Sequence, residues 1–129
     1  MLMHDSGYGS YQQTNLDAQA ASATPHQLVL MLIDGLLDEM IRAKGHISAN
    51  RLAEKGQSIN KCMNILIGLD SALDIENGGE IAVNLHDLYE FVQTELFRSS
   101  VNNDISHIET SENIITTIRE GWKGFSQHA

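Results

Sequence analysis

Apolar residues recur at helical spacing in four separate segments of this chain, and this pattern limits the fold more than any other feature. An apolar residue at every third or fourth position forms one continuous stripe along an α-helix. Apolar and polar residues nowhere alternate over a run long enough for a sheet, and short breaks separate the segments. Such helices pack best as an antiparallel up-and-down four-helix bundle, so we predict an all-α fold of that kind. The segments are Pro25 to about His46, about Asn50 to Ala72, Glu80 to about Val101, and about Ile105 to Phe125.

The start of the first helix has the sharpest boundary signal in the chain. Thr24 places a hydroxyl at the N-cap, Pro25 suits the first helical position, and Gln27 completes a capping box. The residues before it are rich in Gly, Ser, Gln, Asn and Ala, so they cannot form a core of their own. The expected organisation is a flexible N-terminal leader over residues 1–23, one bundle over residues 24–125, and a short tail over residues 126–129.

Between the second and third helices, residues 74–79 predict a turn. Asn77, Gly78 and Gly79 follow one another there, and these residue types adopt positive φ at little cost. We therefore expect the third helix to begin after Gly79.

The charge balance and the absence of long apolar segments argue against nucleic-acid partners and membrane insertion. The chain has 17 acidic and 8 basic residues, which gives a formal net charge of -9. Phosphate backbones repel such a surface, and the basic residues are scattered, so we expect no nucleic-acid partner. The sequence has neither the features of a secretory signal nor an apolar stretch of about 20 residues. We expect a cytoplasmic protein with no membrane insertion.

Catalytic and metal-binding motifs are not found in the sequence. No two of the six histidines lie three or four positions apart, and no Glu-x-x-His pair occurs, so we predict no metal site. The sequence also has no nucleophile elbow and no phosphate-binding glycine loop. The lone cysteine, Cys62, lies in an apolar helical stretch, where a small buried side chain is expected. We predict a protein that is not an enzyme and needs no cofactor.

A histidine phosphotransfer bundle is the alternative function from another class, because such bundles are also small, acidic and four-helical. His86 lies in the middle of a predicted helix, but its neighbour Asp87 would repel a phosphoryl group. His46 lies near a helix end behind Lys44 and Gly45, which is the wrong order for that motif.

The predicted helices carry more apolar surface than one bundle core needs. Leu28 to Ile33 are six consecutive apolar residues, and because each residue turns a helix by about 100 degrees they cover every direction. The second helix adds Ile65 and Ile67 beside its core stripe. Three explanations stay open: burial by neighbouring helices and the leader, homo-oligomerisation, or a groove for an amphipathic segment of another polypeptide.

Several short motifs follow one another along the chain: Tyr8-Gly-Ser-Tyr11-Gln12, Thr24-Pro25 with Leu28 to Gly35, Leu73-Asp74, Gly78-Gly79-Glu80-Ile81-Ala82, Asn84-Leu85, Leu88-Tyr89 and Arg119-Glu120-Gly121-Trp122. In this order and spacing they resemble the flagellar secretion chaperones of the FliS type, which are cytoplasmic chaperones of flagellin. Two positions differ from the family pattern: Ile33 replaces a common tyrosine, and Thr24 replaces a serine while keeping the capping hydroxyl.

The resemblance implies a chaperone that binds the disordered C-terminal segment of flagellin in apolar grooves and prevents polymerisation before flagellar type III export. It also implies that the N-terminal segment covers part of this surface when no cargo is bound, so we assign Tyr8 and Tyr11 to a lid. A homodimer and other flagellar export or regulatory proteins are further candidate partners. By helical geometry we choose the groove residues Met31, Ile33, Leu37, Ile65, Ile67, Leu69, Tyr89 and Leu96.

Overall fold

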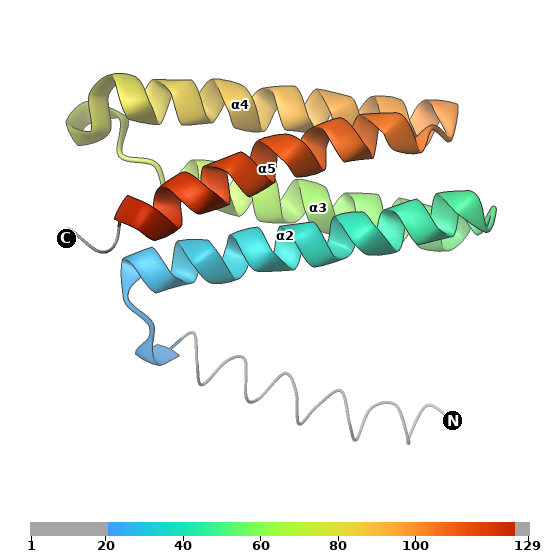
Figure 1. The fold of residues 1–129 in the computed structure, drawn as a ribbon, viewed down its shortest axis with the longest axis horizontal. Coiled ribbons are helices and arrows are strands. Elements are labelled where there is room, and N and C mark those ends of the chain that lie inside the picture. The colour runs from blue at the N-terminus through green and yellow to red at the C-terminus, as the bar shows by residue number, and fades with distance from the viewer. Residues whose placement is uncertain (1–20, 126–129) are drawn as a thin grey trace.

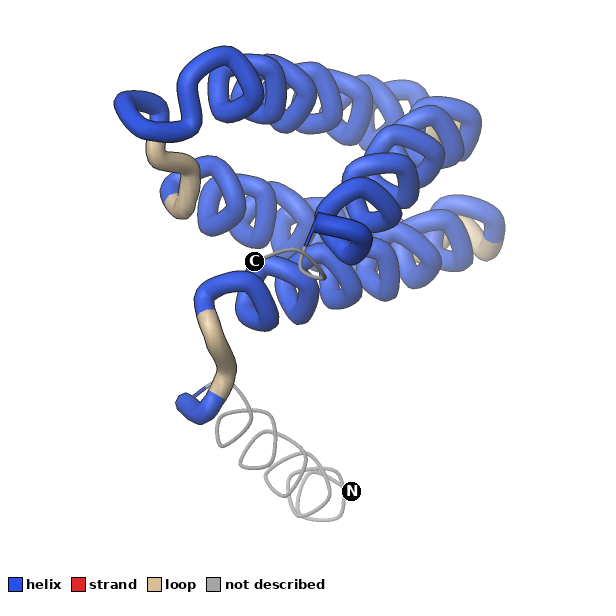
Figure 2. Tube along the Cα trace, turned by 60° about the vertical axis from the view of Figure 1, so that its left-hand side comes forward, coloured by secondary structure: helices blue, strands red, loops and turns tan. Residues whose placement is uncertain are grey.

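A computed structural model describes residues 21–125, apart from the side chain of Phe125. Within this range four long helices run in alternating directions, and the last one returns to lie beside the first (Figure 1). Short loops join them, and the described residues contain no strand (Figure 2). The predicted antiparallel four-helix bundle is therefore confirmed. The helices are α2 (Pro25–Ser48), α3 (Leu52–Ser71), α4 (Ile75–Asn102) and α5 (Ile105–Phe125).

The predicted capping box at the start of α2 is confirmed. The backbone N–H of Gln27 donates to Thr24 Oγ1 at 3.1 Å, and the backbone N–H of Thr24 donates to Gln27 Oε1 at 2.9 Å. These reciprocal bonds satisfy backbone donors that a helix start otherwise leaves open. Residues 1–20 of the predicted leader and the predicted tail 126–129 lie outside the described residues.

The predicted turn over residues 74–79 is wrong in part. A first helical turn already begins at Ile75, because the side chain of Asp74 accepts a hydrogen bond from Asn77 N–H at 3.2 Å and caps it. The chain then bends at Gly79, where φ is 58° and ψ is -134°. Only glycine adopts this backbone conformation readily. A kink inside α4 therefore replaces the expected loop.

The core lies between the four helices and is formed by their inward apolar side chains. Cys62 is fully buried, as expected, and burial raises the pKa of its thiol to about 12, with a smaller contribution from the charge of Glu39. This thiol is therefore protonated and unreactive near neutral pH. The largest fully buried apolar side chains are Ile33, Leu36, Met40, Cys62, Leu66, Leu69, Val92, Leu96, Ile108 and Ile115.

Polar contacts join the helices at the end of the bundle that holds the α4–α5 loop. Lys55 Nζ on α3 donates to the Ser100 carbonyl at 2.9 Å and to Asn103 Oδ1 at 2.7 Å. On the other side of α4, Glu95 Oε2 lies 2.6 Å from His107 Nδ1 on α5. These contacts hold both neighbours of α4 close to it at this end.

No helix in the described residues is long and apolar enough to cross a membrane.

Candidate partner-binding cleft

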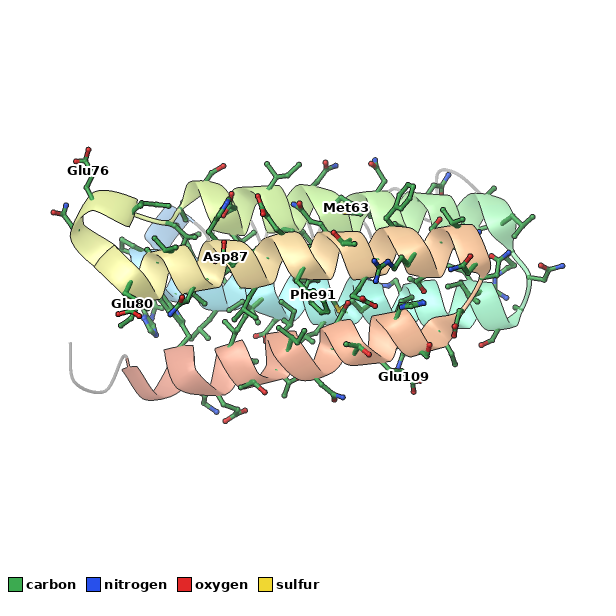
Figure 3. All side chains as sticks on the ribbon, turned by 90° about the horizontal axis from the view of Figure 1, so that it is seen from above. Met63, Glu76, Glu80, Asp87, Phe91 and Glu109 are labelled. Atoms are coloured by element: carbon green, nitrogen blue, oxygen red, sulfur yellow. The ribbon has the colours of Figure 1, made fainter. Side chains whose placement is uncertain are left out.

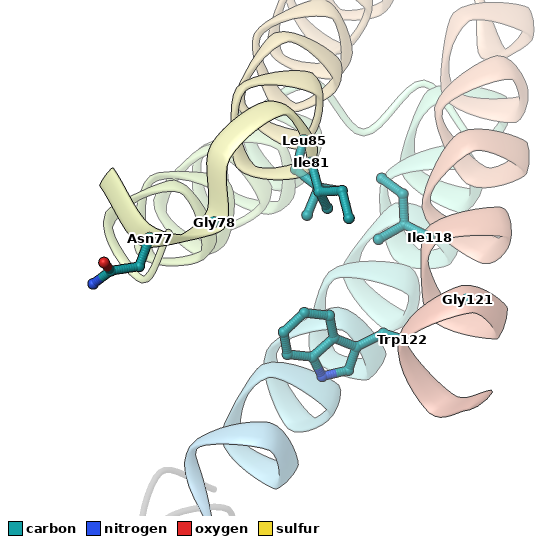
Figure 4. Close-up of a pocket in the computed structure, with 7 residues that line it drawn as sticks. All are labelled: Asn77, Gly78, Ile81, Leu85, Ile118, Gly121 and Trp122. Atoms are coloured by element: carbon teal, nitrogen blue, oxygen red, sulfur yellow. The ribbon is translucent and has the colours of Figure 1, made fainter. Parts of the chain in front are cut away.

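An apolar cleft opens at the opposite end of the bundle, between the first half of α4 and the last turns of α5. It has a volume of about 490 Å³. None of the side chains that line it is charged. We call it the α4–α5 cleft. It is lined by Asn77, Gly78, Ile81, Leu85, Ile118, Gly121 and Trp122 (Figure 4).

Apolar side chains from two helices meet across the cleft. Ile81 and Leu85 on α4 face Ile118 and Trp122 on α5 across the opening (Figure 4). Ile81 is 68% exposed, whereas the other three are half-buried. Apolar side chains that converge on an open space are available to an apolar ligand.

Trp122 forms the wall of the cleft on the side of α2. Its indole Nε1–H donates to the backbone carbonyl of His26 at 3.1 Å. The indole also stacks on the imidazole of His26, with ring centroids 4.9 Å apart and an interplanar angle of 6°. These contacts fix the orientation of the ring. Because Trp122 is the only tryptophan in the chain, its fluorescence should report occupancy of the cleft.

Further apolar side chains extend the cleft along α4. Leu88 and Phe91 follow Leu85 at intervals of three residues, and both are exposed. Glu95 comes four residues after Phe91 and bonds to His107 of α5. Residues at these spacings share one side of a helix, so this row faces the α5 side of the bundle. Figure 3 shows Phe91 about halfway along α4.

The groove residues chosen from the sequence do not line the α4–α5 cleft. Ile33, Leu69, Tyr89 and Leu96 are buried in the core, so in this conformation a partner cannot reach them. From the sequence, their positions on apolar stripes of the helices fitted a core residue and a groove residue equally well. The lid candidates Tyr8 and Tyr11 lie outside the described residues.

The other four chosen residues are on the surface to different degrees. Met31, Leu37 and Ile65 are half-buried, and Ile67 is 55% exposed. Leu37 and Ile65 also pack against the core. These four remain candidates for contact with a partner.

The sequence contained one signal for the cleft that periodicity alone could not interpret. Ile81 directly follows the Gly-Gly-Glu motif, and Trp122 follows Gly121 near the end of α5. These apolar residues beside glycines lie near the start of one predicted helix and near the end of another. Whether those ends meet depends on the tertiary structure.

His86 connects α3 to α4 near the cleft. Its Nδ1 lies 2.7 Å from Asp70 Oδ1 on α3, and its Nε2 lies 3.1 Å from Glu90 Oε1. The hydrogen bond to Asp70 is the main cause that raises the pKa of His86, and the charges of Asp70, Glu90 and Asp87 add to it. Carboxylates on both sides of the ring would repel a phosphoryl group. This geometry is unfavourable for the alternative of histidine phosphotransfer.

The raised pKa of His86 predicts a pH-dependent contribution to stability. A group whose pKa is higher in the folded state stabilises the fold fully below its ordinary value of 6.5, and this contribution is lost as the pH rises through the raised pKa. The melting temperature of His86→Gln should therefore fall below that of the unchanged protein in mildly acidic buffer. The gap should narrow in alkaline buffer. A gap that stays constant across a pH series of thermal melts would contradict this assignment.

Comparisons with known proteins agree with the resemblance found in the sequence. The family model described as "Flagellar protein FliS" matches residues 7–129. The flagellar secretion chaperone FliS of Salmonella typhimurium is 38% identical over 125 residues, which cover 96% of this chain and 93% of that protein. The flagellar secretion chaperone FliSB of Pseudomonas aeruginosa is 37% identical over 90% of this chain and 92% of that protein. The FliS of Escherichia coli is 35% identical over 91% of this chain and 87% of that protein. This chain therefore belongs to the FliS family of flagellar secretion chaperones.

Proposed function

We propose that this protein is a cytoplasmic export chaperone that binds the disordered C-terminal segment of flagellin and keeps flagellin from polymerising before type III export. The observation that supports this most is the uncharged α4–α5 cleft, in which Ile81, Leu85, Ile118 and Trp122 converge. An amphipathic helix places side chains at intervals of three and four residues into such a groove.

The proposed mechanism is holding, without a nucleotide or a covalent step. A disordered segment loses conformational entropy when it folds on the bundle, so a large apolar contact must offset that loss. Burial of roughly 1,000 Å² of apolar surface at about 25 cal/mol per Å² contributes about 25 kcal/mol before that cost is subtracted. The cleft alone is too small for such a contact. We propose that Met31, Leu37, Ile65 and Ile67 provide a second contact area for a long cargo segment.

We also propose that the leader competes with cargo for the cleft. The leader joins the chain just before α2, and the start of α2 lies against Trp122 through the bond from Trp122 to the His26 carbonyl. Tyr8 and Tyr11 are the two tyrosines of the leader, and their large amphipathic rings are suited to an apolar opening. In a full-length Tyr8→Ala, Tyr11→Ala double variant, we expect tighter binding of cargo. Unchanged affinity would remove these tyrosines from the lid.

The test is a titration of the full-length protein with a peptide that spans the C-terminal segment of flagellin. We expect a change in Trp122 fluorescence, a gain of helicity in circular dichroism, and an affinity in the micromolar range or tighter. Sedimentation at the same concentrations checks whether a homodimer occupies the cleft instead. Absence of binding at tens of micromolar peptide would refute the proposed function.

A further inference from the structure

The negative charge of this protein is concentrated around one wall of the cleft. Residues 62–97 contain seven acidic residues and neither Lys nor Arg. This stretch includes the whole α4 wall of the α4–α5 cleft. The charges on the neighbouring part of α5 are mixed, since Arg119, Glu120 and Lys123 follow one another there. The field at the cleft is therefore asymmetric, with the excess of negative charge on the α4 side.

Four of the seven carboxylates already have partners. Asp70 and Glu90 flank His86, as described above. Asp74 caps the start of α4. Glu95 contacts Arg98 at 3.3 Å and His107 at 2.6 Å.

The remaining three carboxylates belong to Glu76, Glu80 and Asp87, and all three residues are exposed. None of them forms an ion pair with any residue that the structure describes. They follow one another along the first half of α4 (Figure 3). We call these three carboxylates the acidic rim. None has an ion-pair partner among the described residues that a ligand would have to displace, although the charge of Asp87 also acts on His86.

Two members of the acidic rim are next to lining residues along the chain, although the side chain of Glu76 points away from α5 (Figure 3). Glu76 precedes Asn77 and Glu80 precedes Ile81, and both of these neighbours line the cleft. Glu80 and Asp87 are seven residues apart, which is close to two helical turns, so they lie on the same side of α4. A partner that inserts apolar side chains into the cleft therefore lies beside the side of α4 that carries Glu80 and Asp87.

Stabilisation of the helix start explains the acidic rim only in part. Carboxylates in the first turn of a helix interact favourably with its dipole, and this accounts for Glu76. It also accounts for Glu80, which follows the kink at Gly79. It does not account for Asp87, which lies beyond the first turn after the kink and whose charge favours the protonated form of His86. Unpaired carboxylates on one helix also repel one another and lower stability.

We infer that the α4–α5 cleft selects an amphipathic helix that carries Lys or Arg beside its apolar stripe, on the flank that faces α4. This inference rests on the proposed function, in which the cleft receives the cargo segment. The alkyl stem of Lys or Arg can pack on Leu88 and Phe91 while its charged end reaches the acidic rim. Because the charge excess lies on one wall, it also sets the orientation of the bound helix.

The test uses three synthetic amphipathic peptides that share one apolar stripe and differ only on one flank, which carries Lys, Gln or Glu. Each is titrated into the full-length protein and followed by Trp122 fluorescence. At low ionic strength we expect the Lys peptide to bind about tenfold more tightly than the Gln peptide, since each exposed ion pair contributes up to about 1 kcal/mol. The Glu peptide should bind more weakly than both. The preference should largely disappear near 1 M salt, where the Debye length falls to about 3 Å.

Two triple variants separate the acidic rim from net charge. The first carries Glu76→Gln, Glu80→Gln and Asp87→Asn, and it should lose most of the Lys preference while binding the Gln peptide as before. The control removes the same number of negative charges at exposed positions away from the cleft, and it should keep the preference. Circular dichroism verifies that both variants fold. The control substitutions are Asp38→Asn, Glu54→Gln and Glu109→Gln.

The possible results distinguish this inference from the proposed function. Equal affinity of the Lys and Gln peptides for the unchanged protein at low salt would overturn the inference, whatever the variants do. An equal loss of preference in both triple variants would also overturn it, because net charge alone would then be responsible. Either result leaves the cleft as a binding site for flagellin. If no synthetic peptide and no flagellin peptide binds, the inference and the proposed function both fail.

Discussion

Replacement of Ile81 by Asp is expected to leave the bundle folded and to weaken binding of the flagellin segment roughly 30-fold or more, the effect of losing an interface hot spot of about 2 kcal/mol. Ile81 is 68% exposed, so a charge at this position costs the free protein little. In the complex the same carboxylate would be buried among Leu85, Ile118 and Trp122 without a partner. The affinity is measured by titration with Trp122 fluorescence.

Ile41 provides a matched control for this substitution. It is also an isoleucine on a helix surface, with 58% exposure, and it does not line the cleft. Ile41→Asp should bind the flagellin segment as the unchanged protein does. If Ile81→Asp bound equally well, the α4–α5 cleft could not be the site of contact.

Replacement of Leu96 by Ala is expected to lower the free energy of unfolding by about 3 kcal/mol, a typical cost for deleting a buried leucine side chain. Leu96 is fully buried and packs in the core with Val92 and Ile108. The removed atoms lose their apolar contacts and leave a cavity that the rigid helices fill only in part. Urea denaturation followed by circular dichroism measures the loss in free energy of unfolding. An unchanged dependence of this free energy on the urea concentration indicates that the transition remains two-state.

The next residue in the chain, Phe97, serves as the control. Its side chain is larger but 62% exposed, so Phe97→Ala should change the free energy of unfolding by only about 0.5 kcal/mol or less. If the two variants lost equal stability, the burial assigned to α4 would be incorrect. A Leu96→Ala variant that remains folded should keep most of its affinity for cargo, because the leucine side chain packs in the core and does not line the cleft.

The sequence was sufficient to predict the helices because the signals for them are local. The capping box of Thr24 and Gln27 and the apolar periodicity involve residues within a few turns of one another. The one helix start that was misplaced, at Ile75, depends on a side-chain cap from Asp74 that competed with the turn signal of Asn77, Gly78 and Gly79. Both signals were present in the sequence, and the structure combines them as a capped turn followed by a kink.

The candidate site was harder to predict because periodicity shows which residues are apolar and not which of them become covered. Leu96 was chosen as a groove residue and is in the core, whereas Ile81 was not chosen and lines the cleft. Both lie on the same helix and have similar apolar character. The two positions differ in how close α5 lies. Next to Leu96, the pair of Glu95 and His107 holds α5 close to α4. The structure describes no such pair near Ile81.

By itself the sequence determined four amphipathic helices, their approximate limits, the excess of apolar surface and the resemblance to the FliS family. Only the tertiary structure decided that this surface opens as a cleft between Ile81 and Trp122. It also decided that Glu76, Glu80 and Asp87, on the helix that forms one wall, have no ion-pair partners among the described residues. The reason is that helix formation depends on neighbours along the chain. Burial and charge pairing depend on how closely helices approach that are far apart in the sequence.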